Sequence, residues 1–187
     1  MKKFIHNFEV VANNRLNAQH FVLELLCSEK LPVILPGQFA EVRIDKSFTT
    51  YLRRPFSIHN VDYKRNTISF LVKQIGAATS NLSTAVVGEI INVVYPLGNG
   101  FILPSSGKVL LVGGGCGVAP LLFLARHLYS LGIQITTLIT IPNRLPEIIR
   151  KPNRMAIRIR IIAISSLMPT PIRIKTSGIT IPIPGPM

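Results

Sequence analysis

The stretch that decides the fold is Leu52-Arg53-Arg54-Pro55-Phe56-Ser57-Ile58. Arg54 carries a permanent charge on a forked set of donors, which suits a diphosphate. Pro55 has no N–H and forces an extended main chain. Phe56 offers an apolar face to a flat ring, and Ser57 a hydroxyl that can reach a ring nitrogen or carbonyl. We therefore predict one rim of a flavin site here; the alternative is that the arginine is a solvated residue at a sheet edge.

The composition bounds the class of protein. The chain has 187 residues and is 48% hydrophobic, which suits one core or two small domains. It has no run of about 18 apolar residues and no apolar signal core after Met1, so we expect a cytoplasmic protein with no membrane segment. Cys27 and Cys116 are its two cysteines and form no C-x-x-C motif, which argues against a disulfide framework or a zinc site.

Short apolar runs separated by turn residues fill the first hundred positions. Several short strands with turn signals about every ten residues are typical of a small antiparallel barrel. We predict a six-stranded barrel over residues 1–103. Its strands are expected at 8–12, 20–26, 39–44, 51–59, 66–73 and 89–95, with residues 13–15 as the first turn.

A change of pattern between residues 76 and 85 predicts a short helix. Gly76 precedes small residues, and Leu82 and Ala85 are spaced to face inward. The first N–H groups of such a helix have no partner within it, so they form an anion site at the positive end of its dipole. The alternative is a surface helix that only links two strands.

Beyond residue 104 the pattern is that of a β-α-β unit. Lys108–Val112 is a continuous apolar run, as expected of a parallel strand buried on both faces. It leads into Gly113-Gly114-Gly115-Cys116-Gly117-Val118-Ala119-Pro120, then a helix over 121–131 and a strand over 134–139. A glycine-rich turn between strand and helix favours a nucleotide pyrophosphate, although glycine turns also serve structure alone.

Three motifs in one order carry a resemblance: R-P-F-S, then Gly76-Ala77-Ala78-Thr79, then the glycine-rich turn at 113–120. With Pro36-Gly37-Gln38-Phe39 and Pro96-Leu97-Gly98-Asn99-Gly100-Phe101, they make the chain similar to the ferredoxin-reductase superfamily from residue 4 to about 139. Within it, the chain most resembles the electron-transfer subunits of NAD-dependent (class 1B) dihydroorotate dehydrogenases.

The resemblance implies an FAD-binding barrel followed by a Rossmann-like α/β nucleotide-binding domain. It implies that FAD is held by the R-P-F-S strand, by residues 71–73 and by the helix start, and that the glycine-rich turn lies beside NAD(H). The implied cofactor-binding residues are Arg54, Pro55, Phe56, Ser57, Leu71, Val72, Lys73, Gly76, Ala78, Thr79, Gly113, Gly114, Gly115 and Gly117. No catalytic or metal-binding side chain is predicted.

The implied chemistry is an electron relay in pyrimidine biosynthesis. Electrons would pass between NAD and FAD, and through a 2Fe-2S cluster to a partner's FMN, where dihydroorotate is oxidised to orotate. The implied partner is that catalytic FMN subunit, in a heterotetramer. The alternatives are a reductase subunit of a sulfide or glutamate-synthase system, and a non-catalytic remnant.

The chain departs from this pattern after Cys116. The family's cluster needs four cysteine thiolates, and only two cysteines are present. We therefore expect an incomplete nucleotide-binding unit over 104–140 and no 2Fe-2S cluster held by this chain.

Residues 141–187 have an unusual composition. They hold eight of the 14 prolines and a net charge of +7, against +6 for residues 1–140. So many irregular prolines exclude most helices and central strands. We predict an irregular basic tail and hypothesise that it arises from out-of-frame translation. A basic arm for nucleic acid or an acidic membrane is the alternative, but the tail has no aromatic residue for stacking, so we expect neither partner.

Overall fold

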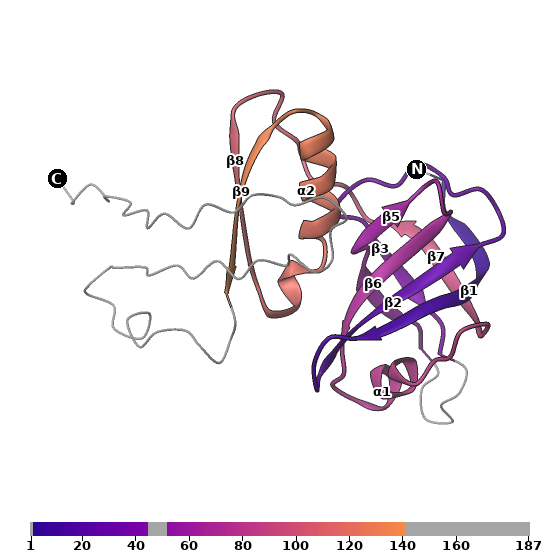
Figure 1. The fold of residues 1–187 in the computed structure, drawn as a ribbon. Helices are drawn as coiled ribbons and strands as arrows, with labels where there is room; N and C mark the ends of the chain where they lie inside the picture. The colour runs from indigo at the N-terminus through magenta and orange to yellow at the C-terminus, as the bar shows by residue number, and fades with distance from the viewer. Residues whose placement is uncertain (1, 45–51, 141–187) are drawn as a thin grey trace.

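The computed structural model of the protein describes residues 2–44 and 52–140. The predictions made for residues 141–187 lie outside these described residues. The described part contains a curled antiparallel sheet, a short helix beside it, and a smaller unit of two parallel strands and one helix (Figure 1).

The antiparallel sheet has seven strands in the order β4-β3-β7-β1-β2-β6-β5. Figure 1 shows it curled into a half-open barrel. The predicted fold class, an antiparallel barrel followed by an α/β unit, is confirmed for the described residues. The strands are β1 (Phe4–Arg15), β2 (His20–Cys27), β3 (Phe39–Val42), β4 (Arg54–Ser57), β5 (Asn60–Asp62), β6 (Thr67–Lys73) and β7 (Ile90–Leu97).

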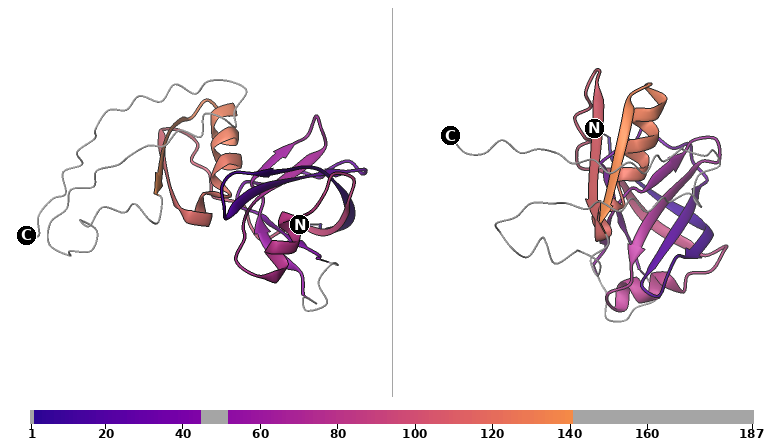
Figure 2. Two further views of the ribbon diagram at one scale, coloured as in Figure 1. Left: turned by 60° about the horizontal axis from the view of Figure 1, so that its bottom comes forward. Right: turned by 60° about the vertical axis from the view of Figure 1, so that its left-hand side comes forward.

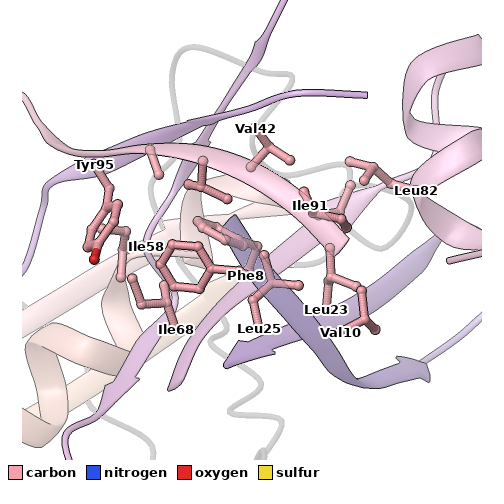
Figure 3. Close-up of a cluster of buried hydrophobic side chains, with 14 of the residues drawn as sticks. Phe8, Val10, Leu23, Leu25, Val42, Ile58, Ile68, Leu82, Ile91 and Tyr95 are labelled. Atoms are coloured by element: carbon pink, nitrogen blue, oxygen red, sulfur yellow. The ribbon is translucent and has the colours of Figure 1, made fainter. Parts of the chain in front are cut away.

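Alternation of side chains builds the core of this barrel. On β1, Phe8 and Val10 are fully buried, whereas Glu9 between them is exposed. The β2 and β6 strands carry the longest buried runs, because both of their edges are paired and their inner faces meet the core. Figure 3 shows the cluster, in which the Tyr95 ring meets Phe8 edge to face at 5.1 Å. Its labelled members are Phe8, Val10, Leu23, Leu25, Val42, Ile58, Ile68, Leu82, Ile91 and Tyr95.

Two details of the barrel differ from the sequence prediction. The sheet has seven strands rather than six, because Asn60–Asp62 pairs with β6 as a separate strand after a break at His59. Residues 13–15 belong to β1 and are not a turn. The reversal lies at Asn17, whose side-chain oxygen accepts hydrogen bonds from the N–H groups of Gln19 and His20.

The loop at residues 36–39 packs against the loop at residues 96–101. Gly37 has φ of +100°, and a Cβ there would lie 2.9 Å from the Phe101 ring. Gln38 is completely buried; its amide donates to the Gly98 carbonyl and accepts from the Leu35 N–H. These contacts fix β3 against the end of β7, which places the neighbouring strand β4.

The smaller unit contains β8 (Lys108–Gly114), a 3-10 turn η1 (Gly115–Val118), α2 (Leu121–Ser130) and β9 (Gln134–Thr140). The β8 and β9 strands pair in parallel, as predicted for a β-α-β unit. Leu111, Leu124, Leu128 and Ile133 form its core. Figures 1 and 2 show α2 between the two-stranded sheet and the barrel. A division between the units after residue 103 stays a prediction.

One prediction for β8 is wrong. The apolar run 108–112 was expected to be buried on both faces, but Leu110 is 55% exposed and Val112 58% exposed. In the described part of the chain α2 covers one face of this sheet, and Leu110 and Val112 point away from it. The apolar run therefore predicted the strand correctly, but not that only one face of it is covered by another described element.

Candidate functional site

The R-P-F-S motif forms β4, an edge strand that pairs only with β3 among the described residues. Pro55 lies opposite Glu41 and is exposed, and an edge strand tolerates its missing N–H. Arg54, Phe56 and Ser57 are half-buried, so each keeps a surface that a ligand can reach.

The two arginines of the motif have different environments. The Arg53 guanidinium donates to the main-chain and side-chain oxygens of Asn92 on β7, at 3.1 and 2.5 Å. The Arg54 guanidinium donates only to neighbouring carbonyls, that of Leu52 at 3.0 Å and that of Arg53 at 3.4 Å. Within the described residues no carboxylate pairs with Arg54, so its charge is the one suited to an external anion.

Phe56 brings β4 towards β6 from the other side of the curled sheet. The Phe56 and Phe70 rings lie 6.2 Å apart and are tilted by 51°. Although β4 and β6 are separated by four strands in the sheet order, this contact shows that the curl brings them together. The motif therefore faces the strand that leads to α1.

The three predicted FAD-binding residues at the end of β6 differ in how far their side chains are exposed. Leu71 and Lys73 are half-exposed, whereas Val72 is 1% exposed and packs in the barrel core. Val72 can therefore meet a ligand only through its main chain. Lys73 pairs with His20 on β2; partial burial and then the Lys73 charge lower the pKa of that histidine.

The predicted helix start lies at α1 (Ala77–Ser83), with Gly76 as its N-cap. The Thr79 hydroxyl accepts from the N–H groups of Ile75 and Gly76 and donates to the Gly76 carbonyl. The first helical hydrogen bond starts at Ser80, so the N–H groups of residues 77–79 precede it. Ala78 is buried, so it can contribute its main chain only.

The glycine-rich turn joins β8 to α2, as predicted. Gly113 is buried, and a Cβ there would lie 2.6 Å from Leu121, so this glycine is needed for packing of the strand against the helix. Gly115 has φ of +54°. Gly114 and Gly117 are exposed, and a Cβ on Gly117 would meet open space. The part of the turn that a ligand can approach is thus Gly114–Gly117.

A contact between the barrel and the smaller β8–α2 unit was not predicted from the sequence. His59, four residues after Pro55, is 4% exposed, and its Nδ1 lies 2.6 Å from the carbonyl oxygen of Ala119. Next to it, Arg126 on α2 donates to the Asn60 side chain at 3.2 Å. A lone histidine in a strand carries no pattern that predicts a partner 60 positions later.

Stability is expected to fall in mild acid because of His59. Burial lowers the pKa of His59 below its ordinary 6.5; the hydrogen bond to Ala119 opposes this, and the Arg126 charge adds to it. The unfolded chain therefore binds the proton more readily, so the contribution of His59 is complete above pH 6.5 and is lost as the pH falls towards the folded pKa.

The measurement is the free energy of unfolding from urea titrations at about pH 7 and about pH 5. The His59→Asn variant keeps a hydrogen-bond donor but does not titrate, so its loss of stability between the two pH values should be smaller than that of the wild type. Equal losses in the two proteins would contradict the assignment.

The remaining features add no second site. Cys27 is buried and Cys116 exposed, both as free thiols, and the described residues contain no cluster of metal-binding side chains. A small hollow between α1, the start of β7 and residues 43–44 after β3 is lined by none of the predicted cofactor-binding residues. No helix in the described ranges has the length and apolar character that crossing a membrane requires.

Comparison of the structure with solved structures defines the class. The NADH-dependent reduced ferredoxin-NADP oxidoreductase superposes with a TM-score of 0.65 and 30% identity, over 72% of this chain and 48% of that one. Phthalate dioxygenase reductase superposes with a TM-score of 0.62 at 20% identity, over 73% of this chain and 43% of that one. The described part of the chain therefore has the ferredoxin-reductase fold.

Within this class, the curated homologues are electron transfer subunits of dihydroorotate dehydrogenase B (NAD(+)). The subunit from Bacillus caldolyticus is 37% identical over 134 residues, 69% of this chain and 52% of the relative. The subunit from Shouchella clausii is 42% identical over 107 residues, 56% of this chain and 41% of the relative. The chain spans about half the length of the curated relatives it matches. No family model matches it.

Proposed function

We propose that this chain is a flavoprotein electron-transfer subunit that binds FAD, exchanges electrons with NAD(H), and delivers them to the FMN-bearing catalytic subunit of a dihydroorotate dehydrogenase. The observation that carries the proposal is the approach of β4 to β6 at Phe56 and Phe70. Through it, the β4 strand that carries Arg54 lies against β6, the strand that leads to α1; among the described residues Arg54 has no carboxylate partner. The homology to electron transfer subunits supports the choice of system.

The residues present fit FAD. Arg54 and the N–H groups at the start of α1 would hold the diphosphate, because both offer donors and positive charge to an anion. Phe56 would pack on the ring system, with Pro55 beside it and Ser57 at the ring edge. Leu71, Val72 and Lys73 would line the flavin, and Gly76, Ala78 and Thr79 would approach it through main chain and cap.

The glycine-rich turn would take the nicotinamide dinucleotide. Gly114 and Gly117 are exposed and Gly115 is half-buried, so their main chain would be open to a diphosphate, and Gly113 keeps the strand close to α2. Bound FAD would supply the chemistry, since it accepts two electrons from NADH and can release them one at a time. The chain's own residues would set the orientation of the two cofactors.

A 2Fe-2S cluster does not fit the residues of this chain. Such a cluster needs four thiolates, and the chain has two cysteines, one buried in the barrel and one exposed on the glycine-rich turn. We therefore assign no step to a cluster held here. The proposed assembly with the catalytic subunit is a heterotetramer.

The full chain, purified and supplied with FAD, tests the proposal. We expect a yellow protein with flavin absorbance that is bleached by NADH in the absence of oxygen. A control without protein measures the slow direct reaction of NADH with free FAD. Colourless protein, or bound flavin that NADH does not reduce faster than free flavin, would contradict the proposal and favour a non-catalytic remnant.

A second candidate is a subunit of another reductase of the same fold, such as one serving a sulfide or glutamate-synthase system. The 30% identity to the ferredoxin-NADP oxidoreductase supports this second candidate, because that protein has the same fold and belongs to another reductase system. NADH-dependent reduction of orotate, on addition of a purified FMN-bearing dihydroorotate dehydrogenase subunit, supports the first candidate. Flavin reduction without any transfer to that subunit supports the second.

A further inference from the structure

Among the described residues, contacts at His59, Asn60 and Phe123 join the barrel to the smaller unit. The His59 Nδ1 meets the Ala119 carbonyl at 2.6 Å. Arg126 donates to the Asn60 side chain. Phe123, on α2, is 7% exposed and belongs to the barrel's core cluster. In Figure 1 this is where α2 faces the barrel.

The position of the first contact along the chain is the informative part. His59 lies two residues after Ser57, the end of the predicted flavin rim, and Ala119 lies two residues after Gly117, the end of the predicted nicotinamide turn. One hydrogen bond therefore connects the two walls between which the cofactors would meet.

Both ends of this hydrogen bond are held by main-chain bonds. On the barrel side, the His59 N–H donates to the Ser69 carbonyl on β6 at 2.9 Å, and the preceding Ile58 N–H donates to the Gln38 carbonyl. On the other side, the Ala119 N–H donates to the Cys116 carbonyl and closes the 3-10 turn. Because neither end is on a long flexible side chain, the hydrogen bond sets the distance between the end of the R-P-F-S strand and the end of the glycine-rich turn.

The position of one imidazole proton follows from the partner. A carbonyl oxygen only accepts, so Nδ1 carries a proton and donates it to Ala119. Arg126 from α2 is the charged group that acts on the ring; burial, and then this charge, lower the pKa of His59 and so favour the neutral imidazole, while the hydrogen bond to Ala119 opposes them.

We propose that His59 is a positioning residue: its Nδ1–H, bound to the Ala119 carbonyl, holds the glycine-rich turn at a fixed distance from the R-P-F-S strand and so sets the distance between nicotinamide and flavin. This inference rests on the proposed function. It goes beyond it by naming a residue outside the predicted cofactor-binding set, which would act through the turn. Small displacements of reacting groups lower rates steeply, which makes such a contact consequential.

Three variants of the full chain test this role. His59→Phe keeps a flat ring but has no donor. His59→Asn places an amide N–H near the position of Nδ1 and should restore the hydrogen bond. His127→Asn is the matched control, because His127 also lies at the smaller unit but its imidazole makes no hydrogen bond to another described residue. Circular dichroism and thermal unfolding establish that each variant is folded.

The first readout is amide hydrogen exchange of residues 113–119, which needs no cofactor. We expect exchange to be about fivefold faster in His59→Phe, the effect of losing one hydrogen bond, and within about twofold of wild type in His59→Asn and His127→Asn. Equal exchange in wild type and His59→Phe overturns the positioning role, whether or not the chain binds flavin.

The second readout is the rate of flavin bleaching by NADH under saturating NADH. We expect a fall of about tenfold in His59→Phe, recovery in His59→Asn, and FAD affinity within about threefold of wild type in both. Faster exchange with an unchanged bleaching rate overturns the proposed effect on electron transfer and leaves the FAD site standing. Absence of bound flavin in the wild type overturns the proposed function instead, and the exchange result is unaffected.

Discussion

Replacing Arg54 with alanine is expected to weaken FAD binding by about 10- to 100-fold, because charge-assisted hydrogen bonds to a diphosphate are worth about 1.5 to 3 kcal/mol. Among the described residues, Arg54 donates only to the carbonyls of Leu52 and Arg53, so its loss should leave the free energy of unfolding of the flavin-free protein nearly unchanged. Quenching of flavin fluorescence on titration with protein gives the dissociation constant, and urea unfolding gives the stability.

Arg53→Ala is the matched control for this prediction. Arg53 is bonded to Asn92 on β7, so its replacement should cost about 1 kcal/mol of stability while FAD affinity stays within about threefold. The two adjacent arginines thus separate binding from folding. If Arg53→Ala weakened FAD binding and Arg54→Ala did not, the predicted diphosphate contact would be assigned to the wrong residue.

The largest loss of stability is expected for Phe8→Ala. Phe8 lies on β1, which pairs with β2 on one side and β7 on the other. Its side chain is completely buried and contacts the Tyr95 ring. Removing a buried ring of this size destabilises a protein by about 3 to 5 kcal/mol, through lost burial and the cavity left behind. Urea unfolding followed by far-UV circular dichroism measures the change.

Ile5→Ala on the same strand is its control. Ile5 points to the opposite face and is 63% exposed, so the change should stay within about 0.5 kcal/mol. A loss for Phe8→Ala no larger than that for Ile5→Ala would mean that the barrel core does not form around β1.

The sequence predicted the barrel because its signals were local. Alternation identified the core strands, and turns such as Pro36-Gly37 marked their ends. It missed β5, a three-residue strand that exists only because β6 offers it a free edge. It also misplaced the first turn, since the side chain of Asn17, and not the Asn13-Asn14 pair, caps the reversal. Asn13 instead donates to carbonyls at the end of α1.

The site was predictable as a set of segments but not as a set of side chains. The order of R-P-F-S, helix start and glycine-rich turn is visible in the sequence. The curl of the sheet brings the R-P-F-S strand into contact with β6, the strand that leads to the helix start. Whether a residue can use its side chain depends on burial, which excludes the side chains of Val72 and Ala78. The contact between His59 and Ala119 depends on how two sheets pack, and no local pattern encodes it.

One face of the β8–β9 sheet is covered by no other described element, which has a consequence for the behaviour of the protein in solution. Leu110 and Val112 on β8 are exposed there and pair with Thr136 and Leu138 of β9, so this sheet face presents apolar side chains to water. Faces of this kind adhere to each other and to hydrophobic resins. Retention on a phenyl column, and turbidity that rises with salt, would then come from this face rather than from a misfolded barrel.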